Sequence, residues 1–230
     1  MPRMQRIARW HVWLGWLVGV PILMWTVTGR FMVARPIDEV RGAHLRHDRP
    51  AAPLLLAEIV PPAIPSPGAK RVKDIRTAMQ RRVAVIIVTY LDGTTARFKA
   101  RTGEALGLVT ADQARRIAEH ELRATSPITS VRLFPADEAP VDFRKPVPAW
   151  RVALADGTYV YIGQESAEIE AARTRWWRIF DVMWGLHIMD LKTREDTSHP
   201  VLILFAALSA VGALLGCIAM FRRRKPRAAS

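Results

Sequence analysis

Two long apolar segments enclose a middle region in which hydrophobic and polar positions alternate. Residues 10–29 contain no Asp, Glu, Lys or Arg, and neither do residues 200–221. A helix of ~20 apolar residues is long enough to cross the hydrocarbon core of a bilayer. We therefore predict transmembrane helices at 10–33 and 200–221. A cleaved signal peptide is the alternative for the first segment, although its apolar part is long and lacks a clear cleavage site.

In the middle region, hydrophobic and polar positions alternate as they do in β-hairpins. An Asp-Gly pair, which favours a tight turn because glycine accepts a positive φ, stands at Asp92 and again at Asp156. The β-branched run Val83 to Tyr90 precedes the first pair, and the segments AWRVALA and TYVYI flank the second. We predict strands near 71–77, 83–90, 94–100, 128–134, 149–155 and 158–162.

Three helices are predicted in the same region. Leu54 to Ile59 is short and is ended by prolines. Ala111 to Arg123 begins after Thr110, with Gln113 in capping-box position. The third, Arg173 to Met189, is dense in tryptophan. We expect it to lie on the outer leaflet as an interfacial helix, the alternative being a helix buried against the membrane spans.

The two hairpins belong to an internal repeat. A shift of 64 residues places Asp92-Gly93-Thr94 on Asp156-Gly157-Thr158 and Glu104 on Glu168. Each copy is predicted to be one helix plus a three-stranded antiparallel sheet. The loop 135–148 has no counterpart in the first copy, so we expect it to be mobile or to face a partner. The predicted order is tail (1–9), transmembrane helix (10–33), connector (34–52), repeat units (53–107 and 108–172), interfacial helix with connector (173–199), transmembrane helix (200–221) and basic tail (222–230).

The charge of the chain is concentrated at its ends. Of the net charge of +13, eight charges lie in residues 1–9 and 222–230, which contain no acidic residue. By the positive-inside rule both termini are cytoplasmic and the middle region lies on the far side of the membrane. The remaining charge is interleaved with acids, which argues against a nucleic-acid partner. Cys217 is the single cysteine, so one chain forms no internal disulfide.

The hairpin with Asp-Gly followed by Thr-Gly-Glu, at residues 92–104 and in weaker form at 156–168, resembles a PepSY domain. The segments that start at Arg9 and Trp184 resemble the membrane segments of PepSY-associated transmembrane proteins. This resemblance implies an α+β membrane protein, in which two transmembrane helices flank a duplicated PepSY-like periplasmic domain. It further implies a non-catalytic module that binds or regulates a protein or peptide partner.

Haem-dependent electron transfer is the alternative function. Some larger PepSY membrane proteins are haem-containing reductases of iron-siderophore complexes, so this chain would be the b-type haem subunit of a periplasmic ferric reductase. The candidate ligands are His11, His187 and His199. His11 lies about 30 Å from the outer face, where the other two are predicted, and so shares no iron with them. Haem would need two copies or a partner subunit; otherwise His11 lies beside tryptophans at the membrane interface.

Other polar residues give weaker hypotheses. His44, His47 and Asp48 are residue types that can bind a metal ion, but the positive charge of the arginines around them disfavours binding of a cation. His120 is predicted to be exposed to solvent. No sequence motif of a hydrolase or a phosphate-binding loop is present, although residues distant in sequence can still form a catalytic site.

Small residues predict close helix packing. Gly212-x-x-x-Gly216 lies in the second span and Gly15-x-x-x-Gly19 in the first. The two helices would pack on each other within the chain or across a homodimer. The expected partners are therefore membrane lipid, a periplasmic protein or peptide and a second copy of the chain.

Overall fold

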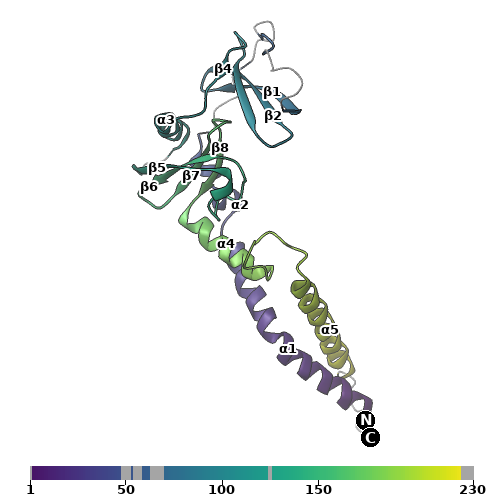
Figure 1. Ribbon diagram of the computed structural model, residues 1–230. Coiled ribbons are helices and arrows are strands. Elements are labelled where there is room, and N and C mark those ends of the chain that lie inside the picture. The colour runs from purple at the N-terminus through teal and green to yellow at the C-terminus, as the bar shows by residue number, and fades with distance from the viewer. Residues whose placement is uncertain (1, 48–52, 54–58, 63–69, 124–125, 224–230) are drawn as a thin grey trace. The chain divides into compact units, whose positions relative to one another are not determined.

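The computed structural model describes residues 2–47, 53, 59–62, 70–123 and 126–223 (Figure 1). The chain forms two compact units. One consists of residues 1–36 with 178–230, and the other of residues 37–177. We call them the helical unit and the sheet unit.

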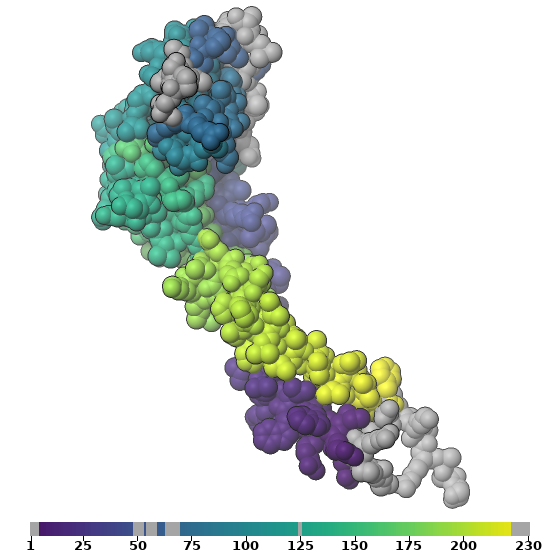
Figure 2. Space-filling model, turned by 45° about the vertical axis from the view of Figure 1, so that its right-hand side comes forward, coloured from purple at the N-terminus to yellow at the C-terminus, as the bar shows by residue number. Residues whose placement is uncertain are grey.

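Two long helices make up most of the helical unit. These are α1 (Pro2–Met32) and α5 (Pro200–Arg223), which lie side by side, purple and yellow in Figures 1 and 2. The segments Gln5–Met32 and Pro200–Phe221 are long and apolar enough to cross a membrane. Large apolar side chains on α1 are exposed, Trp16 by 81% and Val20 by 75%. Such a surface is more favourable in hydrocarbon than in water.

The predicted N-terminal tail is part of a helix. Residues 2–9 continue α1 without a break, because nothing in this stretch stops a helix and Pro2 stands in its first turn, where proline is tolerated. Pro21 lies inside α1. Of the predicted basic C-terminal tail, residues 222 and 223 belong to α5, and the rest lies outside the described residues.

The sheet unit contains two four-stranded antiparallel sheets, each with its strands in sequence order. The first sheet has β1 (Val72–Gln80), β2 (Val83–Tyr90), β3 (Thr95–Lys99) and β4 (Ala105–Leu106). The second has β5 (Ile128–Phe134), β6 (Ala149–Leu154), β7 (Tyr159–Gly163) and β8 (Ile169–Arg173). The shorter helices are α2 (Ile37–Val40), α3 (Ala111–Glu121) and α4 (Arg175–His187), with 3-10 turns at Ala43–Leu45 and Ala136–Glu138.

The structure confirms an α+β fold with antiparallel hairpins, but each sheet has a fourth strand that the sequence did not predict. β4 is only two residues long, and β8 contains few of the β-branched residues that indicate a strand. The two added strands pair in the same way, Phe98 with Ala105 in one sheet and Ile162 with Ile169 in the other.

The two Asp-Gly turns have matching geometry. Gly93 has φ +84° and Gly157 has φ +83°, as the Asp-Gly sequence predicts. In the first turn Thr94 N donates to Asp92 Oδ1 at 2.9 Å, and in the second Thr158 N donates to Asp156 Oδ1 at 2.7 Å. Each turn is therefore closed by its own aspartate.

α3 covers one face of the second sheet. Its predicted capping box is confirmed, since Gln113 N donates to Thr110 Oγ1 at 3.3 Å and Thr110 N donates to Gln113 Oε1 at 2.9 Å. The helix buries Ala114, Ile117 and Ala118 against strand residues, which include Val152, Val160 and Ile162. The predicted helix Leu54–Ile59 falls, apart from Ile59, outside the described residues.

The loop 135–148 covers the opposite face of that sheet. Phe143 is 1% exposed and stacks on Tyr161 with ring centroids 4.6 Å apart. Tyr161 Oη donates to Asp142 Oδ1 at 2.7 Å, and Arg173 Nε donates to the Asp142 carbonyl at 2.6 Å. The loop therefore supplies a second small core, and its mobility or contact with a partner stays a prediction.

Part of the predicted connector 34–52 is also folded. Val40 in α2 is 1% exposed. Arg46 forms a β-bridge with Leu122, and His47 N donates to the Glu121 carbonyl at 3.0 Å. Residues 37–47 therefore belong to the sheet unit and pack against the end of α3.

Candidate functional site

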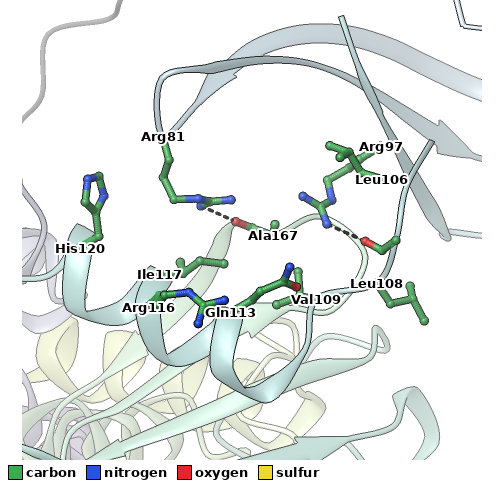
Figure 3. Close-up of a pocket in the computed structure, with 11 residues that line it drawn as sticks. Arg81, Arg97, Leu106, Leu108, Val109, Gln113, Arg116, Ile117, His120 and Ala167 are labelled. Atoms are coloured by element: carbon green, nitrogen blue, oxygen red, sulfur yellow. Dashed lines mark hydrogen bonds between the residues drawn. The ribbon is translucent and has the colours of Figure 1, made fainter. Parts of the chain in front are cut away.

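The sheet unit has a cleft between its two sheets, above α3 (Figure 3). Its volume is about 470 Å³, within the range of about 300–1,000 Å³ that is usual for ligand pockets. One side is formed by the first sheet and the segment after it, and the other by α3 and the turn before β8. The lining residues are Arg81, Arg97, Leu106, Gly107, Leu108, Val109, Gln113, Arg116, Ile117, His120 and Ala167.

Arg97 lies in the wall of the cleft on β3 and is 9% exposed. Its Nε donates to the Glu165 carbonyl at 2.7 Å and its Nη2 to the Gly107 carbonyl at 2.9 Å. No described carboxylate forms an ion pair with it. Burial lowers the pKa of the Arg97 guanidinium, and the neighbouring positive charge of Arg81 lowers it further. The negative charge of Glu168 acts in the opposite direction. The group is thus a buried cation that donates hydrogen bonds to neutral carbonyl oxygens.

Arg81 reaches the cleft from the turn between β1 and β2. Its Nη1 donates to the Ala167 carbonyl at 3.1 Å and pairs with Glu121 Oε1 at 2.8 Å. Arg81 and Arg82 both have positive φ, +49° and +70°. This two-residue hairpin turn therefore has the left-handed conformation that Gly and Asn normally supply.

Three polar side chains of α3 border the same cleft. Gln113, Arg116 and His120 follow one another at spacings of three and four residues, so they share one face of the helix. All three are exposed. No hydrogen bond or ion pair joins Arg116 to any other described residue. Because Arg116 is exposed and has no ionic partner among the described residues, its charge is available to a ligand.

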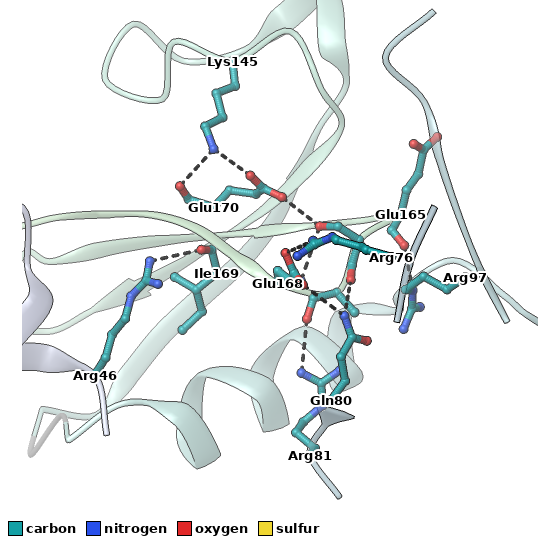
Figure 4. Close-up of polar contacts among 12 residues, drawn as sticks. Arg46, Arg76, Gln80, Arg81, Arg97, Lys145, Glu165, Glu168, Ile169 and Glu170 are labelled. Atoms are coloured by element: carbon teal, nitrogen blue, oxygen red, sulfur yellow. Dashed lines mark hydrogen bonds and ion pairs between the residues drawn. The ribbon is translucent and has the colours of Figure 1, made fainter. Parts of the chain in front are cut away.

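The two sheets are joined by polar contacts beside the cleft (Figure 4). The turn 165–168, between β7 and β8, accepts hydrogen bonds from side chains of the first sheet. Arg76 pairs with Glu168 at 2.6 Å, and Gln80 Nε2 donates to the Ser166 carbonyl at 3.0 Å. Gln80 Oε1 is buried without a described partner. This network fixes the position of Arg81 and Arg97 relative to α3.

His11 lies in the contact between α1 and α5. Its Nδ1 is 3.0 Å from the Gly212 carbonyl, so a tautomer with a proton on Nδ1 donates to that oxygen. A Cβ placed on Gly216 would be 2.8 Å from His11 Cε1. The ring therefore occupies space that exists only because residue 216 is glycine. By contrast, nothing lies within 4 Å of a Cβ placed on Gly15 or Gly19.

His187 lies near the other end of α1. Its Nδ1 is 2.9 Å from Thr28 Oγ1, and its carbonyl accepts a hydrogen bond from Trp25 Nε1 at 2.8 Å. Burial lowers the pKa of His187. His199 precedes α5, where its carbonyl accepts from Ile203 N at 3.2 Å, and its buried Nδ1 has no described partner.

His11 does not share a haem iron with His187. His11 and Thr28, the partner of His187, are about 26 Å apart along α1 at 1.5 Å per residue. Two axial ligands of one iron would need to be only ~4 Å apart. His11 also fills the space against Gly216 and uses one ring nitrogen in a hydrogen bond. The arrangement suits helix packing, and haem ligation stays a prediction that requires a second chain.

The described residues contain no cluster of three or more His, Cys, Asp or Glu side chains that could hold a metal ion. Of the proposed ligands His44, His47 and Asp48, the last lies outside the described residues. The sequence reasoning missed the cleft arginines, Arg81, Arg97 and Arg116. The Arg81-Arg82 pair at a hairpin turn, where Gly or Asn is usual, is the signal that could have indicated one of them.

No protein-family model, no curated protein and no solved structure matches the chain.

Proposed function

We propose that the chain is a PepSY-like protein of the bacterial inner membrane, anchored by α1 and α5, whose sheet unit lies in the periplasm. There it binds a protein or peptide partner without catalysing a reaction. The observation that carries the proposal is the cleft of the sheet unit, which is large enough for a ligand and is lined by arginines and apolar side chains.

The proposed topology rests on length and charge. α1 and α5 contain two segments that are long and apolar enough to cross a bilayer. The arginines at the start of the chain, Arg3, Arg6 and Arg9, and the basic residues after 221 favour a cytoplasmic position for both ends. The sheet unit, which lies between the two helices in sequence, is then outside the cytoplasm.

The lining of the cleft favours binding over catalysis. None of the described residues that line it has a hydroxyl, a thiol or a carboxylate. Nucleophilic catalysis most often uses such a group next to a base, and His120 is the one described lining residue that can act as a base. Metal-assisted catalysis requires several ligands. Cationic and apolar side chains in one cleft instead match a partner that presents negative charge beside apolar groups.

The family assignment rests on the turns. The sequence at 92–104 and 156–168 resembles PepSY, and both turns have the same φ at glycine and the same closing aspartate. The two sheets have the same strand order, which supports the proposal of a duplicated domain.

Site-specific photo-cross-linking in living cells tests this function. A photoreactive amino acid would replace Leu108, which lines the cleft and is 58% exposed. Leu91, in the β2–β3 turn, is also 58% exposed and provides the matched control. We expect a discrete adduct with one envelope protein or peptide from position 108 and none from position 91. The absence of an adduct at 108, or identical adducts at both positions, contradicts the proposal.

A further inference from the structure

The cleft of the sheet unit has more positive than negative charge in and around its lining. Arg81 is paired with Glu121. Neither Arg97 nor Arg116 forms an ion pair with a described residue, and the charge of Glu168 offsets that of Arg97 only in part and without direct contact. Arg97 is 9% exposed, and a charge buried without a counter-ion is costly for the folded state. An anionic ligand would supply the missing partner.

The nitrogen atoms of Arg97 show how such a ligand would be held. Nε and Nη2 donate to carbonyl oxygens, and Nη1 has no hydrogen bond with a described residue. Figure 3 shows the guanidinium groups of Arg81 and Arg97 in the space above α3, with the Arg116 side chain lying along the helix beside Gln113. Donors therefore converge on the cleft from both sides. A guanidinium matches the planar geometry of a carboxylate, which it can bind with two hydrogen bonds.

The other lining residues indicate what kind of ligand bears the anionic group. Leu106, Val109 and Ile117 contribute apolar surface beside the arginines. At about 470 Å³ the cleft is many times larger than the ~30 Å³ that one water occupies, so an inorganic ion would leave most of it unfilled. A ligand with a carboxylate at one end and apolar side chains behind it would fill the space.

The turn that presents Arg81 is unfavourable by itself. Arg81 and Arg82 have positive φ, a conformation that costs roughly 1–2 kcal/mol for a residue with a Cβ. Strained backbone of this kind is often retained at binding sites. Here it holds the Arg81 guanidinium beside the Ala167 carbonyl at the edge of the cleft.

We infer that this cleft recognises the free C-terminal carboxylate of an apolar peptide, with Arg97 and Arg116 binding the carboxylate. The inference rests on the proposed function, because it specifies the chemistry of the partner. It assigns a binding role to three arginines, Arg81, Arg97 and Arg116, that are far apart in the sequence.

Binding of short peptides to the full chain in detergent tests the inference, with fluorescence anisotropy as the measurement. The probe is a fluorescently labelled tetrapeptide of alanine and leucine with a free C-terminus. The comparison ligands are its C-terminal amide, an amidated version with one internal glutamate, and octanoate as a competitor. We expect the free acid to bind at least about tenfold more tightly than the amide, since an ionised hydrogen bond is lost.

Arg116→Ala is the informative variant. Arg97 also holds two carbonyl oxygens, so its removal would disturb the fold, whereas Arg116 is exposed and has no partner among the described residues. We expect Arg116→Ala to weaken binding of the acid by about tenfold. Arg115→Ala, one residue away on α3 and outside the cleft lining, is the matched control and should leave binding unchanged.

Each outcome bears on the inference. Equal affinity for acid and amide, or equal affinity of wild type and Arg116→Ala, overturns it. Tighter binding of the internal glutamate peptide, or displacement by octanoate at equal concentration, overturns the assignment to a peptide C-terminus. If peptides fail to bind while position 108 still cross-links a partner, the inference fails and the proposed function stands. If the acid binds selectively but no partner is cross-linked in cells, the inference stands and the proposed function fails.

Discussion

Gly216→Ala should separate α1 from α5 more than its size suggests. The added Cβ would lie 2.8 Å from His11 Cε1, 3.4 Å from Nε2 and 3.5 Å from Nδ1. Carbon atoms in contact are normally ~3.5–4.0 Å apart, so the ring must move by at least about 0.7 Å. That movement breaks the 3.0 Å hydrogen bond between His11 Nδ1 and the Gly212 carbonyl.

Three contributions determine how much Gly216→Ala changes the free energy of unfolding. Overpacking of a filled contact costs about 1–3 kcal/mol, and loss of the hydrogen bond costs about 0.5–1.5 kcal/mol. Alanine is the better helix former by ~1 kcal/mol, which opposes both. We therefore predict that Gly216→Ala lowers the free energy of unfolding by about 1–3 kcal/mol. Gly19→Ala, with nothing within 4 Å of its Cβ, should be neutral or slightly stabilising.

The assay is unfolding of the full chain in mixed micelles, followed by the exposure of its tryptophans as the denaturing detergent increases. A double-mutant cycle with His11→Ala makes the test specific. In that background the Cβ at position 216 meets no ring, so Gly216→Ala should behave like Gly19→Ala. Two results would refute the reasoning. One is equal stability of Gly216→Ala and Gly19→Ala in the wild-type background. The other is that Gly216→Ala lowers the free energy of unfolding by the same amount in the His11→Ala background.

Three further predictions concern other parts of the chain. Gly157→Ala should lower the thermal unfolding temperature more than Gly93→Ala, because both need a positive φ but only at Gly157 does the new Cβ come within 2.6 Å of an arginine side chain. Hydrogen bonds from Thr94 lower the pKa of Asp92 from 3.8 to about 2, so the contribution of Asp92 to stability is present above pH ~4 and lost as the pH falls towards 2; acid unfolding of Asp92→Asn should lack this component. If haem binds across two chains, the purified protein has a Soret absorbance band that His11→Leu removes, and a colourless, well-inserted wild-type protein would contradict haem ligation.

The elements that could be predicted from the sequence are those fixed by neighbouring residues. Asp92-Gly93 and Asp156-Gly157 specify their turns through glycine φ and an aspartate that accepts from the residue two positions later. The capping box of Thr110 is equally local. Long apolar runs similarly predict α1 and α5, the two helices that are long and apolar enough to cross a membrane.

The elements that were missed depend on residues far apart in the chain. β8 forms because β7 offers it an open edge, although its own sequence alternates weakly. The loop 135–148 has no counterpart in the first repeat unit, so nothing in the sequence indicated that its Phe143 stacks on Tyr161 of β7. The cleft joins Arg97 of β3 to Arg116 of α3, and no spacing rule relates the two positions.

The rate of thiol labelling by a membrane-impermeant maleimide tests the central claim most directly. Leu108→Cys and Leu91→Cys would be made separately in a Cys217→Ser background, and each labelling rate in intact spheroplasts would be divided by the rate for the purified chain. We predict that both positions are labelled without breaking the cells, and that the ratio is several-fold lower at 108, where a bound partner shields the cleft. Labelling that requires broken cells would contradict the periplasmic location, and equal ratios at the two positions would contradict an occupied cleft.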